Sequence, residues 1–226
     1  MSDLMAQLKV CPLFRNLPES VLENHILPHG NLLEIPSNAA IIQYQQKVDC
    51  FSVVISGRVH TMHSFEDGTY SIFHVLHPGG VIGVDLLWTG SRVAPYFAVA
   101  AEDSQVVQFP ASLLEEDGGL GTKYRLQILE QILMLISQDN MRKEYRLSIL
   151  SRKGLRERIL TYLSMQGAKR RTSTFTIPFT REELASFLCV NRSAMCHELS
   201  LMQQEGLISF RKNEFTLYNW ESTMVP

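Results

Sequence analysis

The stretch from Thr180 to Ile208 constrains the fold of this 226-residue chain more than any other. Thr180 and Glu183 have the spacing of a capping box, which predicts that a helix begins at this point. Asn191 can cap a second helix, whose apolar side chains follow at i, i+4 and i+7. The small side chain of Ala185 lets the second helix cross the first one closely. We therefore predict two packed helices whose inward residues are Leu184, Ala185, Leu188, Met195, Leu199 and Met202.

The opposite face of the second predicted helix carries short polar side chains and one Arg at its start. Such groups can reach base edges in the major groove of DNA without blocking entry of the helix. Arg192 can bind a guanine with two hydrogen bonds, Ser193 can donate or accept, and His197 can reach a guanine or a phosphate. This face predicts a recognition helix, although an αα-hairpin that packs only internally has the same periodicity.

Two short alternating segments follow Gly206, one on each side of Arg211-Lys-Asn213, and predict a two-stranded β wing with cations at its tip. A wing after a capped helix pair favours a winged helix-turn-helix unit that binds double-stranded DNA. Upstream, a charged helix with an apolar stripe ends at Gly167, and a short strand lies around Phe175. We predict DNA contacts from Thr180, Arg181, Arg192, Ser193, His197 and Lys212.

Charge is distributed unevenly along the chain. Residues 1–116 hold five Lys and Arg against twelve Asp and Glu, a balance of −7, and residues 117–226 hold sixteen against eleven, a balance of +5. The formal net charge of −2 hides this asymmetry. Two modules with different partners are therefore expected, and the basic one is the candidate for binding phosphate.

Short runs of β-branched and aromatic residues, separated by turn signals, fill the sequence from Ile35 to Phe109. Their spacing of about 8–12 residues between turns predicts an antiparallel jelly roll or barrel sandwich. Asp67-Gly68 suits a type I′ hairpin turn. The expected strands are Phe51–Ile55, Val59–Phe65, Tyr70–Leu76, Phe97–Val99 and Val106–Phe109.

Histidines in this β region raise the alternative of a cupin-like metal-binding protein. The usual His-x-His pair with a following Glu is missing, however, and an enzyme of that kind would not explain the winged segment. Residues three apart on one strand point to opposite faces, which separates the members of each pair. We expect no metal or haem site and no enzyme activity from the pairs His60 with His63 and His74 with His77.

Cysteines are few and scattered, with no C-x-x-C pair. An iron–sulfur cluster, a structural zinc site or a disulfide framework is therefore not expected. Two alternatives remain for Cys11 and Cys50: a reactive thiol that acts as a switch, or a buried thiol that packs as a small apolar side chain, which is the commoner case.

No segment reads as a membrane or export signal. The N-terminus has an acid at Asp3 and no long apolar run, and Leu126–Gln138 is too short to span a bilayer. We expect a cytoplasmic protein without a membrane partner.

A long helix with apolar heptad positions is expected between residues 119 and 150. Its a and d positions stay apolar for several turns, and one a position is polar. This pattern favours a helix that pairs with a second copy over one that packs only on its own domain. The predicted dimer contacts are Leu126, Leu129, Leu133, Ile136 and Asn140, the last one fixing the register.

These motifs together resemble the Crp/Fnr family of bacterial transcription regulators, in which "T-R-x-E-L-A … V-N-R-S-A-x-x-x-E-L … E-G-L-I" is typical. The resemblance covers most of the chain, and its other segments are Cys11 to Phe14, Ile55-Ser-Gly57, Asp67-Gly68, Pro78 to Gly83 and Lys153 to Leu163.

The resemblance implies an α+β fold: a β-roll sensor domain (1–118), a dimerisation helix (119–150) and a winged helix-turn-helix domain (151–226). It also implies a homodimer on a palindromic operator with half-sites one helical turn apart, about 34–36 Å. A bound effector would reorient the dimer helices and so set the spacing of the two recognition helices, and RNA polymerase would be a further partner.

Several positions depart from the family pattern. Cys189 stands where the turn usually has Gly, and His197 replaces an Arg that reads bases. Cyclic-nucleotide binders of the family have a Glu directly after the last Gly of the segment that corresponds to Pro78–Gly83, and an Arg about ten residues further on. Here Gly83 is followed by Val84, and Arg92 lies earlier in the sequence than the expected Arg. A buried phosphate without a guanidinium partner is poorly held, so cyclic AMP and cyclic GMP are not expected.

A small, partly apolar or aromatic effector is expected instead, between the β roll and the dimer helix. A degenerate sensor that binds no effector is the remaining alternative. The predicted lining consists of Gly83, Val84, Asp85, Trp88, Arg92, Tyr96, Leu126 and Leu129, with Phe97 nearby.

Overall fold

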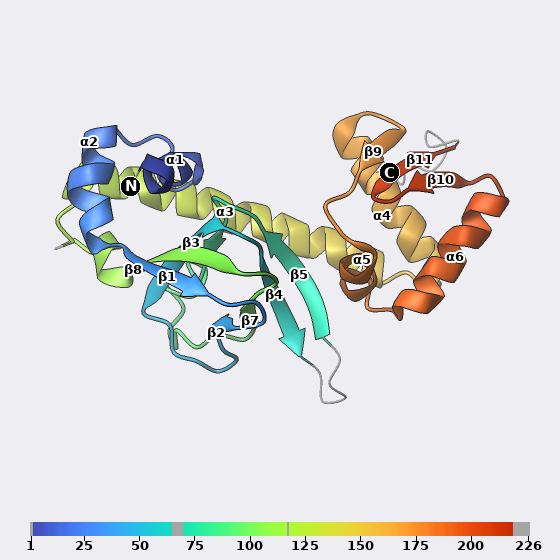
Figure 1. The fold of residues 1–226 in the computed structure, drawn as a ribbon, viewed down its shortest axis with the longest axis horizontal. Coiled ribbons are helices and arrows are strands. Elements are labelled where there is room, and N and C mark those ends of the chain that lie inside the picture. Colours follow the sequence, from blue (N-terminus) through green and yellow to red (C-terminus); the bar gives the residue numbers. More distant parts are fainter. Residues whose placement is uncertain (1, 65–69, 117, 219–226) are drawn as a thin grey trace. The chain divides into compact units, whose positions relative to one another are not determined.

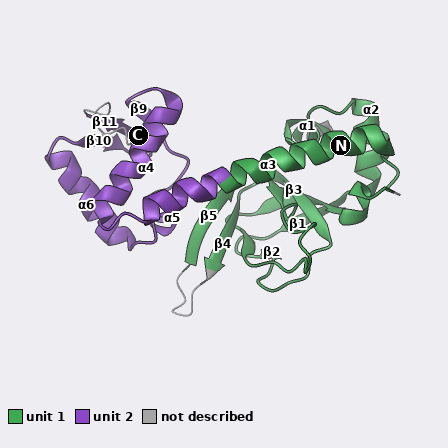
Figure 2. Ribbon diagram, turned by 180° about the vertical axis from the view of Figure 1, so that it is seen from behind, with its two compact units in different colours: residues 1–140 green, residues 141–226 purple. Residues whose placement is uncertain are grey.

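The computed structural model describes residues 2–64, 70–116 and 118–218. The chain forms two compact units, Met1–Asn140 and Met141–Pro226 (Figure 2). The boundary falls within one helix, α3 (Gly121–Leu150), which contributes to both units. The domain boundaries expected at residues 118 and 150 stay predictions. None of the helices among the described residues has the length and apolarity that a membrane span requires.

Unit 1 contains two four-stranded antiparallel sheets that form the β roll (Figure 1). The first sheet has the order β1 (Asn31–Ile35), β8 (Ser104–Pro110), β3 (Cys50–Ser56) and β6 (Val81–Ile82). The second has the order β2 (Ala40–Ile42), β7 (Phe97–Ala100), β4 (Val59–Ser64) and β5 (Tyr70–Leu76). The predicted β domain is confirmed, with β1, β2 and β6 added. Phe65 and the predicted Asp67-Gly68 turn lie outside the described residues.

Two apolar clusters hold unit 1 together, and β3 belongs to both because it is buried on both faces. One cluster lies around Val54, Val59, Tyr96 and Val106. The other packs the first sheet against α1 (Ser2–Val10), α2 (Glu19–Val21), the helical turns Leu22–Ile26 and Leu27–His29, the turn Ala111–Leu114, and part of α3. A strand buried on both faces reads as a continuous apolar run, which is how Phe51–Ile55 appears in the sequence.

Cys11 lies in the second of these clusters with no exposed surface. Burial raises the pKa of its thiol to about 12, so the thiol stays protonated and packs as a small apolar group. Burial and the neighbouring Asp49 also raise the pKa of Cys50. Neither thiol has the lowered pKa that marks reactive cysteines.

The helix α3 has two apolar faces. Ile128 and Ile132 are buried against unit 1. On the opposite side, Leu133 is 66% exposed and Leu126 is 49% exposed. The two interpretations of this helix, packing on its own domain and pairing with a second copy, therefore concern different faces, and the exposed one remains the predicted dimer contact.

Unit 2 contains α4 (Leu155–Arg170), α5 (Arg181–Phe187), α6 (Arg192–Gln204) and a three-stranded sheet. The sheet has the order β10 (Ile208–Arg211), β11 (Glu214–Leu217) and β9 (Thr174–Thr176), so the predicted wing hairpin gains a third strand. The predicted helix end at Gly167 is wrong, because α4 continues to Arg170 and ends with Arg171 in the left-handed region at φ 53°. Gly167 instead permits close packing, since a Cβ there would lie 3.3 Å from the Phe175 ring.

Candidate nucleic-acid interface

The helix α5 begins with the capping box that the sequence predicts. The Thr180 hydroxyl accepts a hydrogen bond from the Glu183 backbone N–H at 3.2 Å, and the Glu183 carboxylate accepts one from the Thr180 N–H at 2.7 Å. Leu184, Ala185 and Leu188 are buried, as predicted. The box satisfies two backbone donors at the helix start and fixes the entry of the helix-turn-helix.

The turn between α5 and α6 contains a left-handed residue that is not glycine. Cys189 has φ 55°, the backbone conformation that the family's usual Gly adopts without steric cost. The Val190 N–H donates to the Ala185 carbonyl at 3.0 Å, and the Cys189 N–H donates to the Ser186 carbonyl at 3.1 Å. The turn thus keeps its hydrogen bonds and carries the strain of a side chain in this region.

Two arginines hold the carboxyl end of α5, and neither was foreseen from the sequence. Arg146 of α3 donates from Nε to the Phe187 carbonyl at 3.2 Å and from Nη2 to the Cys189 Sγ at 3.7 Å. Its guanidinium lies 5.0 Å from the Phe187 ring centre, and burial lowers its pKa. Arg158 of α4 donates to the Leu188 carbonyl at 3.4 Å. Cations at a helix carboxyl end satisfy carbonyls that have no partner within the helix.

The helix α6 presents the predicted polar face. Met195, Leu199 and Met202 are buried beneath it, and Arg192, Ser193 and His197 are exposed. The Asn191 side-chain oxygen caps the helix by accepting from the Ser193 N–H at 2.9 Å and from the Ser193 hydroxyl at 2.7 Å. The hydroxyl proton of Ser193 is therefore used within the protein, which leaves its oxygen as an acceptor.

The helix α6 is tied to α4 by one arginine. Arg156 donates from Nε to Glu198 at 2.6 Å and from its two terminal nitrogens to Glu205 at 2.7 and 2.9 Å. The hydrogen bonds to Glu205 and Glu198 raise the pKa of Arg156. A forked pair of this kind fixes orientation as well as distance, so it fixes α6 and its carboxyl end against α4.

The wing tip places Lys212 and Arg181 differently. Lys212 is exposed in the tight turn between β10 and β11, at φ 52°. Arg181 lies over the rings of Phe210 and Phe215, 4.8 and 4.7 Å from their centres, and donates to the Lys212 carbonyl at 2.7 Å. Burial lowers its pKa. Arg181 thus braces the wing from the start of α5, a contact between residues 31 apart in the chain that sequence spacing did not reveal.

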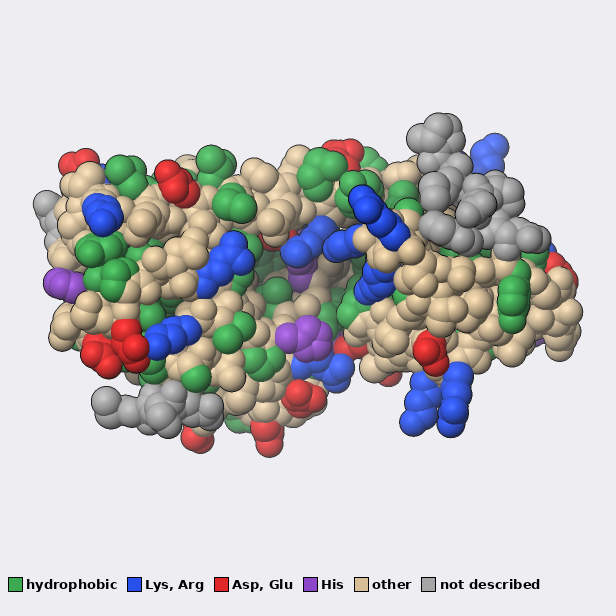
Figure 3. All heavy atoms as spheres, turned by 90° about the horizontal axis from the view of Figure 1, so that it is seen from above, with side chains coloured by type: hydrophobic (Ala, Val, Ile, Leu, Met, Phe, Trp, Pro, Cys, Tyr) green, Lys and Arg blue, Asp and Glu red, His purple; other side chains and the backbone are tan. Residues whose placement is uncertain are grey.

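In the space-filling view, Lys and Arg side chains (blue) protrude from the part of the molecule formed by unit 2 (Figure 3). Thr180, Arg192, Ser193, His197 and Lys212 are all exposed on this unit, whereas Arg181 is half-buried. The arrangement offers one guanidinium, one imidazole and one hydroxyl acceptor on a single helix face, with a cation at the wing tip. These are groups that bind base edges and phosphates.

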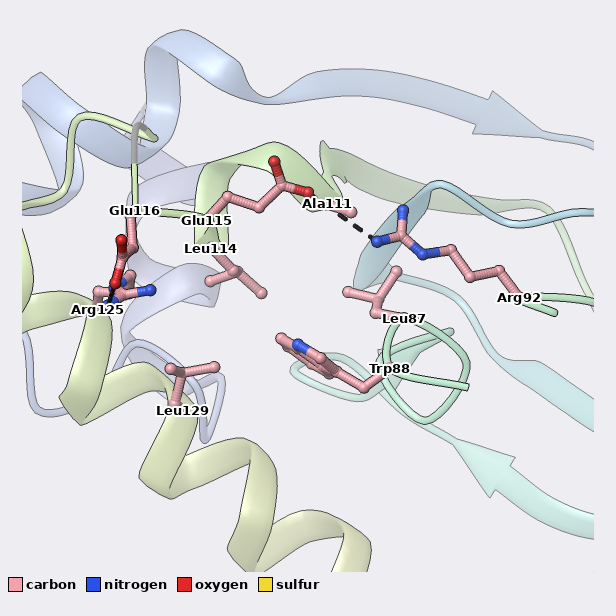
Figure 4. A pocket seen from close by; sticks show the side chains of 9 residues that line it. All are labelled: Leu87, Trp88, Arg92, Ala111, Leu114, Glu115, Glu116, Arg125 and Leu129. Atoms are coloured by element: carbon pink, nitrogen blue, oxygen red, sulfur yellow. Dashed lines mark hydrogen bonds and ion pairs between the residues drawn. The ribbon is translucent and has the colours of Figure 1, made fainter. Parts of the chain in front are cut away.

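The residues predicted to line an effector pocket fall into two places. Trp88, Arg92 and Leu129 line a hollow of about 280 Å³, together with Leu87, Ala111, Leu114, Glu115, Glu116 and Arg125 (Figure 4). The others do not line it: Val84 and Tyr96 are buried, Leu126 faces outward on α3, and Gly83 makes a turn at φ 86°. The Tyr96 hydroxyl donates to Asp85 at 2.7 Å, and burial and this carboxylate raise the pKa of Tyr96.

Within the described ranges, no cluster of three or more His, Cys, Asp or Glu side chains has the arrangement of a metal site. His74 lies 3.9 Å from Asp139 of α3.

Two family models match the chain. Residues 32–116 match the model described as "Cyclic nucleotide-binding domain", and residues 157–222 match the "Crp-like helix-turn-helix domain". The first covers most of the β roll, and the second covers the helix-turn-helix with its wing.

Characterised proteins resemble the chain over most of its length. The chain is 23% identical over 210 residues to the "Anaerobic regulatory protein" of Pasteurella multocida (strain Pm70), covering 89% of this chain and 75% of that protein. It is 23% identical over 214 residues to the "Fumarate and nitrate reduction regulatory protein" of Escherichia coli (strain K12), covering 90% and 82%.

Solved structures show the same fold. The c-di-GMP responsive global regulator CLP of Xanthomonas campestris aligns with a TM-score of 0.69 and 17% identity, covering 89% of this chain and 100% of that one.

Proposed function

Because this chain belongs to the Crp/Fnr family of transcription regulators, we propose that it binds a palindromic operator as a homodimer, with the α6 helix of each protomer in the major groove. The family consists of DNA-binding regulators and not of enzymes. The cupin-like alternative is thereby set aside.

The single observation that carries the proposal is the exposed face of α6. Arg192 and His197 project from it beside Ser193, above the buried Met195. Arg192 suits the O6 and N7 of a guanine. Since the Ser193 proton goes to Asn191, Ser193 suits a base with an amino group in the major groove, adenine or cytosine. His197 is shorter than the family's usual Arg and contacts a neighbouring base or phosphate.

Contacts to the phosphate backbone would come from the wing tip and from the adjacent start of α5. Lys212 at the wing tip is an exposed cation that suits phosphate, and the exposed Thr180 hydroxyl at the start of α5 can donate to one. We assign Arg181 to holding the wing in place, since its guanidinium already packs on Phe210 and Phe215. These contacts would make binding weaken steeply with salt.

The exposed apolar face of α3 supports the homodimer. Side chains of this size left in water on one helix face are characteristic of an interface. Leu129 is half-buried at its edge, and Asn140 is exposed and polar on the same face, as a register-fixing residue of a coiled coil would be. The exposed apolar residues are Leu126, Leu133, Met134, Ile136, Met141, Tyr145 and Leu147, of which Met134, Met141 and Tyr145 extend the predicted set.

We further propose that a small molecule other than cyclic AMP controls the regulator through unit 1. The position after Gly83 holds Val84, which is buried and offers no group for a ribose hydroxyl. Arg92 points its guanidinium toward Asp49 and Glu115. RNA polymerase is the proposed partner at the promoter, and the cytoplasm the proposed compartment.

Selection of bound duplexes from a random pool tests the DNA-binding proposal. We expect enriched sequences with two inverted half-sites one helical turn apart, about 34–36 Å. Each half-site should contain a guanine next to a base that presents an amino group. Enrichment of a single asymmetric site, or no enrichment above the starting pool, would contradict the proposal.

A further inference from the structure

The hollow of unit 1 is walled on one side by an aromatic ring that the core does not use. Trp88 is 56% exposed, although tryptophan is the largest apolar side chain of the chain. Its ring faces the hollow from the loop that also carries Arg92 (Figure 4). An exposed ring beside a concave surface is a typical stacking wall for a flat ligand.

The floor of the hollow is apolar and fixed. Leu87, Ala111 and Leu114 are buried in the apolar cluster that packs the first sheet against the helices, so their positions are set by packing. Leu129 closes the hollow from α3. A rigid apolar floor under an open aromatic wall favours a ligand with a flat apolar body.

Two guanidinium groups lie on opposite sides of the hollow, with Leu114, Leu87 and Trp88 between them (Figure 4). Arg125 has a side chain only 20% exposed, whereas its partner Glu116, at 3.3 Å, is 84% exposed. Arg92 is more exposed and is shared between Asp49 at 3.4 Å and Glu115 at 4.0 Å. Ion pairs to well-exposed carboxylates contribute little, so a ligand anion can replace Glu116 at Arg125 at low cost.

The backbone at Arg92 is strained and held in place. Its φ of 52° is unfavourable for a residue with a side chain. The Arg92 N–H donates to the Thr89 hydroxyl at 3.1 Å, and its carbonyl accepts from the Val48 N–H at 2.8 Å. Strain that the surroundings fix in this way occurs preferentially at ligand-binding sites.

We propose that this hollow binds a small aromatic carboxylate, with its ring against Trp88 and the leucines and its carboxylate on Arg125. The volume of about 280 Å³ suits a ligand of one or two rings. Arg125 and Leu129 lie on α3, so the ligand contacts the same helix that carries the proposed dimer face. Binding of the ligand at this site does not depend on the proposed function, but its role as the effector of a DNA-binding regulator does.

Tryptophan fluorescence tests the site directly. Trp88 and Trp220 are the only tryptophans of the chain, so Trp220→Phe leaves Trp88 as the sole reporter. The full-length variant is titrated with benzoate and phenylacetate and, in parallel, with their uncharged amides. We expect a saturable change in Trp88 emission with the carboxylates, and an affinity for the amides lower by about tenfold or more, the usual loss when a charged hydrogen bond is removed.

A matched pair of variants separates the site from a general charge effect. Arg125→Gln should weaken carboxylate binding by about tenfold, whereas Arg15→Gln should leave it unchanged. Arg15 also contacts α3, through Gln131 at 3.3 Å, but does not line the hollow. Thermal unfolding of each variant establishes that it is folded.

Three results would overturn the site: no saturable response to either acid, equal affinity for acid and amide, or equal loss in the two variants. Operator selection without ligand tests the proposed function independently. Failure of ligand binding with normal operator binding would refute this site alone, whereas ligand binding without operator binding would refute the proposed function alone.

Discussion

Replacing Cys189 by glycine and by alanine measures the strain stored in the turn of the helix-turn-helix. Cys189 has φ 55°, where a Cβ meets the following carbonyl group. Glycine removes the Cβ and the thiol together. Alanine removes only the thiol and its 3.7 Å contact with Arg146, and it keeps the Cβ that causes the strain.

The expected gain follows from two opposing terms. A side chain in the left-handed region costs about 1–2 kcal/mol. Glycine recovers this cost but makes the unfolded chain more flexible, which takes back about 0.4–1 kcal/mol. The exposed thiol contact contributes little, because sulfur is a weak acceptor. Cys189→Gly should therefore raise the free energy of unfolding by about 0.8 kcal/mol, the middle of a range of about 0–1.6 kcal/mol. Cys189→Ala should leave it unchanged or slightly lower.

Urea unfolding followed by circular dichroism measures both variants. With a typical dependence on urea of about 2 kcal/mol/M, the glycine variant should shift the midpoint upward by about 0.4 M. A lower midpoint for Cys189→Gly would show that the turn is not strained. An equal rise for Cys189→Ala would show that the thiol, not the Cβ, is responsible.

Three further predictions concern the proposed recognition helix α6, the dimer and the core. Arg192→Ala should abolish discrimination between operator and random DNA in a gel-shift assay while the dimer stays intact. The control Lys169→Ala, which removes an exposed cation from α4, should keep that discrimination. Unchanged discrimination in Arg192→Ala would exclude Arg192 from base contact. Leu133→Glu should give monomers in analytical ultracentrifugation because it places a charge in the proposed interface. Gln43→Glu, at an exposed position outside α3, should leave the dimer intact, and a dimeric Leu133→Glu would refute this interface. The raised pKa of Cys11 means that the unfolded state loses the thiol proton first, so stability should fall as pH rises from the ordinary 9.0 toward about 12. Cys11→Ala should weaken this alkaline dependence in urea titrations at several pH values, and an identical dependence would contradict the buried-thiol assignment.

Local signals in the sequence were sufficient for the helix-turn-helix. The Thr180 and Glu183 capping box and the buried positions of α6 depend on residues within a few places of one another, and each lies where predicted. The wing also followed from its alternation. The same holds for most strands of the β roll, since β-branched runs between turns are local features.

Side-chain partners that come from distant segments could not be predicted in this way. The contact of the Arg181 guanidinium with the rings of Phe210 and Phe215, about 30 residues later, is of this kind, and the expected DNA contact of Arg181 stays a prediction. Gly167 had the sequence signature of a helix end, yet it is small because Phe175 packs against it. Tyr96, which directly precedes β7, was expected to line a pocket, and its side chain lies in the core of the β roll instead. Which side chains of such a segment meet the core depends on how the strands pair and not on composition.

The hydrogen bonds at the start of α6 make the helix cap part of the reading surface. Asn191 contacts no base in the proposed complex, yet it decides where the Ser193 proton points. A residue at this position that could not accept both bonds would free the hydroxyl to donate as well as accept, and thymine or guanine carbonyl oxygens would then compete with amino groups. Operator preference and helix stability therefore cannot change independently at this site, which restricts the substitutions through which a descendant of this regulator could acquire a new operator.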